Sequence, residues 1–175
     1  VAIGTVADMV PMIGENRALV RQGLHYIRNN TRQGLYSLLG ISNIKPEGVT
    51  SSTIGFSIGP RINAAGRIAS ADDALKLLLS NDVSEIGQLA QTLDNHNRER
   101  QKITRTIQEE AENQAIAEDE DALLLFAADP SFNPGVVGLA ASRLVDKYYR
   151  PSIVGHQGEE FTRASCRSIS EFHIT

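Results

Sequence analysis

Residues 83–117, VSEIGQLAQTLDNHNRERQKITRTIQEEAENQAIA, decide the architecture that we predict for this chain. Apolar residues recur along the stretch at spacings of three and four, which is the period of one face of an α-helix. No glycine or proline interrupts residues 88–129. A helix over 83–117 would be about 50 Å long at about 1.5 Å per residue. This length predicts a connector between two lobes, and the polar residues 95–102 predict that its middle is solvated.

The composition changes after this helix. An acidic tetrapeptide is followed by the apolar run 122–126, which predicts a buried strand. The dipeptide Asn133-Pro134 predicts a helix start, with asparagine as the cap and proline in the first turn. Two further strands are predicted over 151–154 and 160–167. A strand, a helix and a strand in this order are typical of an α/β domain.

The residues before the long helix predict a second, separate lobe. We predict a buried strand over 1–6, helices over 15–28, 33–39 and 71–79, and a loop over 45–52. The whole chain is therefore predicted to be an α/β protein in three parts, 1–82, 83–117 and 118–175. It begins and ends inside apolar stretches, so we interpret it as a piece of a longer polypeptide.

Composition narrows the class of protein. The 175 residues are 41% hydrophobic and carry 17 Lys and Arg against 21 Asp and Glu, a net charge of −4. This composition excludes a disordered chain, and the sequence has no apolar run long enough for a membrane helix. The charge is uneven, since residues 101–175 hold seven basic side chains against twelve acidic ones. Bulk charge gives no support to nucleic-acid binding, so any such binding would depend on local basic clusters.

Cys166 is the single cysteine of the sequence. One cysteine excludes an internal disulfide and a paired-cysteine zinc site. It fits a reducing compartment, so we predict a cytoplasmic protein with no membrane association. We interpret Cys166 as a packed thiol without a catalytic role.

Residues 4–11, GTVADMVP, place the carboxylate of Asp8 just after the predicted first strand. Ligands bind at the carboxyl ends of strands in α/β sheets, and a carboxylate there can bind a divalent metal. The alternative is that Asp8 only caps a turn before Pro11. The spacing by itself leaves both interpretations open.

Residues 58–67, IGPRINAAGR, combine two arginines and Asn63 with glycines and alanines. Arg61 and Arg67 can bind phosphate through two parallel hydrogen bonds, and the small residues would let a partner approach the backbone. The alternative is an ordinary loop with solvated arginines.

The last candidate regions are residues 132–138 and 163–169. Free amides at the predicted helix start could hold an anion, although Gly135 and Gly138 could equally serve close packing. Along a strand, Arg163, Ser165 and Arg167 would share one face and form a phosphate-binding track. The alternative is an exposed sheet face without a ligand.

Four strings in this order resemble a known family. GTVADMVP at 4–11, IGPRINAAGR at 58–67, GVVGLAASRL at 135–144 and CRSISEFH at 166–173 are similar to strings of the RecJ-like exonucleases. These enzymes belong to the DHH phosphoesterase superfamily. The resemblance covers essentially the whole chain, and IGPRINAAGR is its most specific part.

The resemblance implies a fold and an activity. It implies the end of a DHH catalytic lobe over 1–82, a connector helix over 83–117 and a partial DHH-associated α/β domain over 118–175. It implies an exonuclease that degrades single-stranded DNA from the 5′ end in DNA repair and recombination, with manganese or magnesium as cofactor. A single-strand-binding protein would be a partner by the same analogy.

The resemblance also implies roles for particular residues. Asp8 matches a metal-ligand aspartate and, with Arg67, would be catalytic. The substrate would be bound by Arg61, Asn63, Arg67, Ser165, Arg167 and Ser168.

The sequence departs from the family pattern. The first three catalytic motifs, including the Asp-His-His string, are absent, and no two of the four histidines are adjacent. We therefore expect the chain by itself to be inactive. Two alternatives stay open: a DHH-superfamily phosphoesterase for small nucleotides, and a non-catalytic DNA-binding scaffold.

Overall fold

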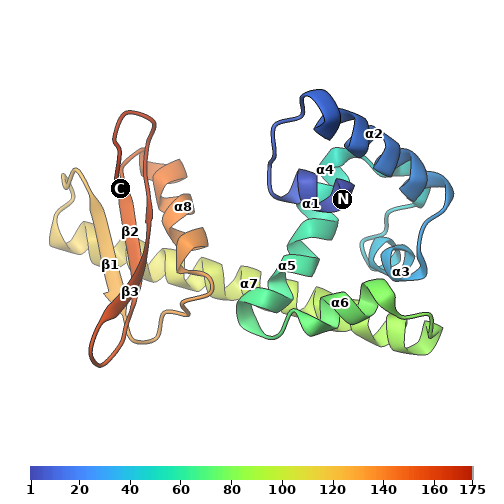
Figure 1. Ribbon diagram of the computed structural model, residues 1–175. Coiled ribbons are helices and arrows are strands. Elements are labelled where there is room, and N and C mark those ends of the chain that lie inside the picture. The colour runs from blue at the N-terminus through green and yellow to red at the C-terminus, as the bar shows by residue number, and fades with distance from the viewer. Residues whose placement is uncertain (175) are drawn as a thin grey trace. The chain divides into compact units, whose positions relative to one another are not determined.

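The structure is a computed structural model that describes residues 1–174, except for the side chain of Glu118. The chain forms two compact units, Val1–Arg98 and Glu99–Thr175. The helix α7 (Val83–Glu118) runs through the boundary and belongs in part to each unit (Figure 1). The helix predicted over 83–117 is thus observed almost residue for residue. No helix within residues 1–174 has the length and apolarity needed to cross a bilayer.

The first unit is helical throughout. Its core is formed by aliphatic side chains such as Leu38, Ile58, Leu77 and Leu93, which are at most 1% exposed. The helices before α7 are α1 (Ala2–Ala7), α2 (Gly14–Asn29), α3 (Gln33–Ile41), the 3-10 turn η1 (Pro46–Gly48), α4 (Ser51–Thr53), the π-helical η2 (Ile54–Ile58), α5 (Gly59–Ile68) and α6 (Asp72–Leu79).

The strand predicted over 1–6 is wrong, because these residues form the helix α1. A short apolar run is compatible with a strand or with a buried helix, and periodicity cannot separate the two. Here the packing against α2 favours the helix. A Cβ atom added at Gly23 of α2 would lie 2.3 Å from the Cβ of Ala2. The absent side chain at Gly23 therefore lets α1 pack closely against α2.

Residues 58–67 are also helical rather than a loop. Pro60 is the second residue of α5, which follows the π-helical η2 without a break. Proline has no N–H to donate, so the missing hydrogen bond lies next to this π-helical turn. Gly59 approaches α1, since a Cβ added there would lie 3.3 Å from that of Ala7. Ala64 and Ala65 are fully buried. Most of the small residues of this stretch therefore serve helix packing rather than contact with a ligand.

The second unit contains a small mixed sheet. The strands β1 (Leu125–Asp129), β2 (Ser152–Gln157) and β3 (Thr162–Arg167) lie in the order β1-β2-β3. β1 and β2 are parallel and joined through α8 (Val137–Tyr148), whereas β3 is antiparallel to β2. The predicted strand–helix–strand unit is confirmed, but β1 begins at Leu125, three residues after the start of the apolar run 122–126, and α8 begins at Val137 rather than at Pro134. The chain as a whole is mostly helical with a three-stranded sheet.

Two expectations about exposure need correction. The middle of α7 is only partly solvated: Arg98 is exposed, but Asp94 is 1% and Asn97 is 4% exposed. The buried face of the helix simply continues at spacings of three and four, with polar residues on it. Cys166 is exposed rather than packed, because it points to the face of β3 opposite Ser165 and Arg167.

Candidate functional site

The structure brings three of the predicted site residues together. Asp8, Asn63 and Arg67 line one pocket of about 540 Å³ in the first unit. Asp8 follows α1, whereas Asn63 and Arg67 lie one turn apart on α5. The wall of the pocket is completed by Ile62, Gly66, Ala71, Ala74, Leu75 and Leu78.

Backbone geometry holds Asp8 in place. It is the C-terminal cap of α1, and its N–H donates to the Gly4 carbonyl at 2.9 Å. Met9 adopts a left-handed conformation with φ of 52°, and the N–H groups of Met9 and Val10 donate to Val6 and Thr5. This is a Schellman motif with methionine at the position that glycine usually occupies. The turn fixes the direction in which the Asp8 side chain leaves the helix.

The negative charge at one side of this pocket favours binding of a cation by the Asp8 carboxylate. The carboxylate lies at the C-terminal end of α1, where the helix carbonyls already carry partial negative charge. The Asp8 side chain is exposed, so a ligand can reach it. The arginine on the same pocket wall, Arg67, provides a permanent positive charge for an anionic ligand.

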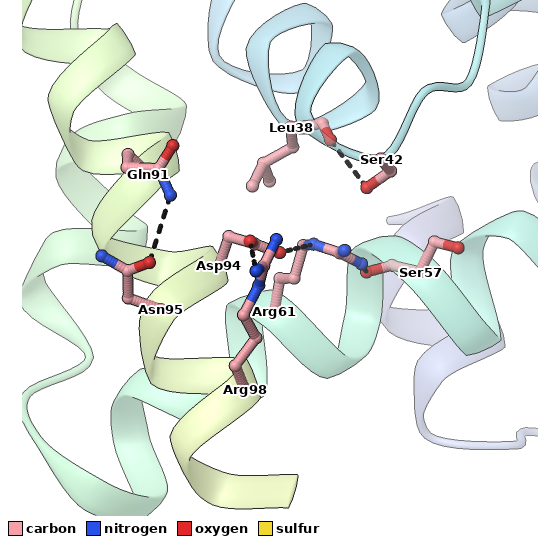
Figure 2. A network of polar contacts seen from close by, with 8 residues as sticks. All are labelled: Leu38, Ser42, Ser57, Arg61, Gln91, Asp94, Asn95 and Arg98. Atoms are coloured by element: carbon pink, nitrogen blue, oxygen red, sulfur yellow. Dashed lines mark hydrogen bonds and ion pairs between the residues drawn. The ribbon is translucent and has the colours of Figure 1, made fainter.

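Arg61 does not join this group. Its Nε donates to the Asp94 carboxylate at 2.9 Å, and another guanidinium nitrogen donates to the Ser57 carbonyl at 2.9 Å. Asp94 also accepts from Arg98 at 2.8 Å, so its carboxylate lies between two guanidinium groups (Figure 2). The Arg61 side chain is 16% exposed. This arrangement holds α5 against α7 and gives Arg61 a structural contact.

A second group of predicted residues lies on β3. A Cβ atom added at Gly138 would lie 3.0 Å from the Ser165 Oγ and 3.1 Å from a terminal nitrogen of Arg167. Both side chains therefore reach the first turn of α8, as the predicted strand alternation requires. Arg167 also donates to the Cys166 carbonyl at 2.7 Å. The Ser168 hydroxyl donates to the Phe172 carbonyl at 2.6 Å and serves a local turn.

Sequence reasoning missed two polar groups. Asp94 was not singled out, although it stands four residues before Arg98 and continues the buried spacing of Ala90. His156 on β2 was missed as well, and its Nδ1 lies 2.9 Å from the Phe132 carbonyl oxygen. No local sequence signal marks His156, because its partner is 24 residues away.

The residues present do not make a complete metal site. Within the described residues, no three His, Cys, Asp or Glu side chains lie close enough together to hold a metal ion. Asp8 supplies a single carboxylate, whereas magnesium and manganese sites need several oxygen ligands. The side chains that the structure describes therefore do not by themselves complete the predicted manganese or magnesium site.

Comparison with known proteins gives one consistent relationship. No protein-family profile matches the chain. The single-stranded-DNA-specific exonuclease RecJ of Bacillus subtilis is 41% identical over 175 residues, which cover 99% of this chain and 22% of that protein. RecJ of Dickeya dadantii is 39% identical over 180 residues, covering 99% of this chain and 31% of its own length.

Solved structures agree with the sequence comparison. The crystal structure of Thermus thermophilus RecJ in complex with Mg²⁺ aligns with a TM-score of 0.87 at 34% identity, over 99% of this chain and 26% of that one. Exonuclease RecJ bound to manganese aligns with a TM-score of 0.82 at 34% identity, over 99% of this chain and 42% of that one. The chain spans between 22% and 42% of the length of these relatives. Over nearly all of its residues, the chain is therefore homologous to one partial region of the single-stranded-DNA-specific exonuclease RecJ.

Proposed function

We propose that this chain is part of a metal-dependent exonuclease that degrades single-stranded DNA from the 5′ end in DNA repair and recombination. The observation that carries the proposal is the meeting of Asp8, Asn63 and Arg67 in one pocket. These residues come from two helices more than 50 positions apart in sequence, and the whole chain is homologous to RecJ. A cytoplasmic location and a single-strand-binding protein as partner stay predictions.

In this proposal, Arg67 and Asn63 bind the phosphate that reacts. A guanidinium group can donate two parallel hydrogen bonds to phosphate oxygens, and the Asn63 amide can donate another. Arg67 would stabilise the transition state more than the bound substrate, because negative charge builds up on the phosphate oxygens during the reaction. The guanidinium charge is already in place and needs no rearrangement. Asp8 offers one carboxylate ligand to a divalent ion whose other ligands lie outside this chain.

Ser165 and Arg167 form a separate contact region for the strand. The Ser165 hydroxyl and the Arg167 guanidinium lie beside the first turn of α8, where backbone amides and the helix dipole favour anions. Contacts of this kind bind the phosphate backbone and carry no base specificity. Ser168 and Arg61 serve local structure, so we assign neither a direct contact with the reacting phosphate.

A chimeric enzyme tests the proposal. The chain would replace the matched 175-residue region of Bacillus subtilis RecJ, and release of mononucleotides from 5′-labelled single-stranded DNA would be measured. The substitution Asp8→Ala should slow release more than tenfold, a loss of over about 1.4 kcal/mol in transition-state stabilisation. Strand affinity should change little, because the Asp8 carboxylate contacts no phosphate in this proposal.

The two arginines should respond differently in the same chimera. Arg67→Ala should lower the single-turnover rate more than the affinity, because its charge matters most in the transition state. Arg167→Ala should weaken binding of all sequences about equally and reduce the log–log salt slope by roughly 0.7. Lysine at either position should rescue only in part.

Three outcomes would contradict the proposal. If an active chimera releases mononucleotides at the same rate after Asp8→Ala, Asp8 only caps a turn and has no role in catalysis. Preference for small dinucleotides over single strands would favour another DHH-superfamily phosphoesterase. A chimera that binds single strands but never hydrolyses them would favour a non-catalytic scaffold.

A further inference from the structure

A second pocket in the first unit is lined by arginines. It has a volume of about 370 Å³, and Arg17, Arg21 and Arg28 of α2 all face it. Their spacing of four and seven residues places them on one side of the helix. The other lining residues are Met12, Val20, Leu24 and Ser51. No acidic side chain lines the pocket among the residues that the structure describes.

The charge of this face is not balanced locally. Arg17, Arg21 and Arg28 are exposed, and none of them forms an ion pair with any side chain that the structure describes. By contrast, the exposed Arg105 on α7 forms an ion pair with Glu109 at 2.8 Å. Two arginines four residues apart on a helix repel each other, which costs stability unless an anion lies between them.

One of the three arginines is already held in position. The Arg28 Nε donates to the Val49 carbonyl at 2.8 Å. This bond uses one of the five N–H donors of the guanidinium and fixes the plane of the others. A guanidinium that is fixed before binding loses less conformational entropy when it meets a ligand.

We propose that this α2 pocket binds phosphate groups of a single strand of DNA at a site separate from the pocket that contains Asp8. The inference rests on the proposed function, because that function identifies the bound ligand as single-stranded DNA. The arginines extend along about 16 Å of helix at about 1.5 Å per residue, which is too long for one phosphate group. A strand with several phosphates matches this length, and the apolar Met12 and Leu24 provide surface for its sugars.

A short loop connects residues of the two pockets along the chain. The loop of residues 8–13 runs from Asp8 at the end of α1 to the start of α2 (Figure 1). Met12 in this loop lines the arginine pocket, while Asp8 lines the other. Both pockets lie in the same compact unit. A strand bound by α2 is therefore held by the element next to the Asp8 turn.

The test measures binding of a fluorescein-labelled oligothymidine to the 175-residue chain by anisotropy at several salt concentrations. The double substitution Arg17→Gln with Arg21→Gln should weaken binding and lower the log–log salt slope by roughly 1.4, or about 0.7 for each phosphate contact. The matched control is Arg105→Gln with Arg143→Gln, which removes the same charge from exposed positions outside the pocket. The control should leave the slope almost unchanged.

The outcomes separate this inference from the proposed function. If the unsubstituted chain binds and both double variants behave alike, the α2 site is refuted while the proposed function stands. If the unsubstituted chain shows no binding of the single strand, the α2 site is refuted, whereas the proposed function is decided by the chimeric enzyme. Arg17→Lys with Arg21→Lys keeps both charges and should retain most of the slope. Should the double glutamine variant fail to fold by circular dichroism, Arg21→Gln alone decides, with an expected slope change of roughly 0.7.

Discussion

The Asp94 carboxylate is buried and neutralised from two directions. Arg61 on α5 approaches it at 2.9 Å and Arg98 approaches it at 2.8 Å (Figure 2). The two arginines are not equivalent, because the Arg61 side chain is 16% exposed and that of Arg98 is 74% exposed. A buried pair is strongly destabilised when one partner is removed, since the remaining charge stays buried without compensation.

We therefore expect Asp94→Asn to lower the free energy of unfolding by about 3 kcal/mol. Arg98→Ala is the matched control and should cost at most about 1 kcal/mol, because water screens an exposed pair. Urea unfolding followed by circular dichroism measures both. Equal losses for the two variants would show that the Arg61–Asp94 contact does not anchor α5.

At the scale of elements, α7 and α8 are joined through Glu112 in the second unit. The Glu112 carboxylate accepts hydrogen bonds from the Lys147 ammonium at 2.5 Å and the Tyr148 hydroxyl at 2.6 Å. The hydrogen bond from Lys147, with that from Tyr148, lowers the pKa of Glu112 below its usual 4.5. The same contact with Glu112 raises the pKa of Lys147 above 10.5.

These directions predict how stability depends on pH. A carboxylate with a lowered folded-state pKa adds stability that is complete above its unfolded pKa and is lost as pH falls through the folded value. The stability difference between the native chain and Glu112→Gln should therefore be constant near neutral pH and shrink as the pH falls below about 4.5. Urea unfolding across this pH range measures the difference.

The control for this contact is Glu110→Gln, an exposed change two positions along α7. It should show no comparable dependence on pH. A Glu112→Gln variant whose stability parallels the native chain at every acidic pH would mean that α7 and α8 are held by their apolar contacts alone.

At the scale of the whole molecule, we predict that the chain cannot hydrolyse DNA by itself. Its candidate metal ligand is one carboxylate, and no three potential ligands cluster among the side chains that the structure describes. A two-metal hydrolysis needs several acids to hold the ions. Incubation with manganese and 5′-labelled single-stranded DNA should release no mononucleotides above the level of an Asp8→Ala control. Release well above that control would contradict the prediction.

The sequence by itself determined the elements with strong local signals. Uninterrupted helical spacing predicted α7. Asp82 directly precedes this helix, and its Oδ1 accepts a hydrogen bond from the Ser84 N–H at 2.8 Å. The alternation of β3 correctly placed Ser165 and Arg167 on one face. These features depend on neighbours a few residues apart, so local sequence is sufficient to specify them.

Only the tertiary structure decided which residues meet. Local pattern could not show that residues 1–6 form a helix, because that depended on Gly23 of α2. It could not separate Arg61 from Arg67, since the buried partner Asp94 lies 33 residues away. The joining of Asp8 with Asn63 and Arg67 in one pocket is likewise a long-range result. Such contacts form because the packing of helices buries their apolar faces. Local sequence leaves several conformations equally available, and the burial of one face against another selects one of them.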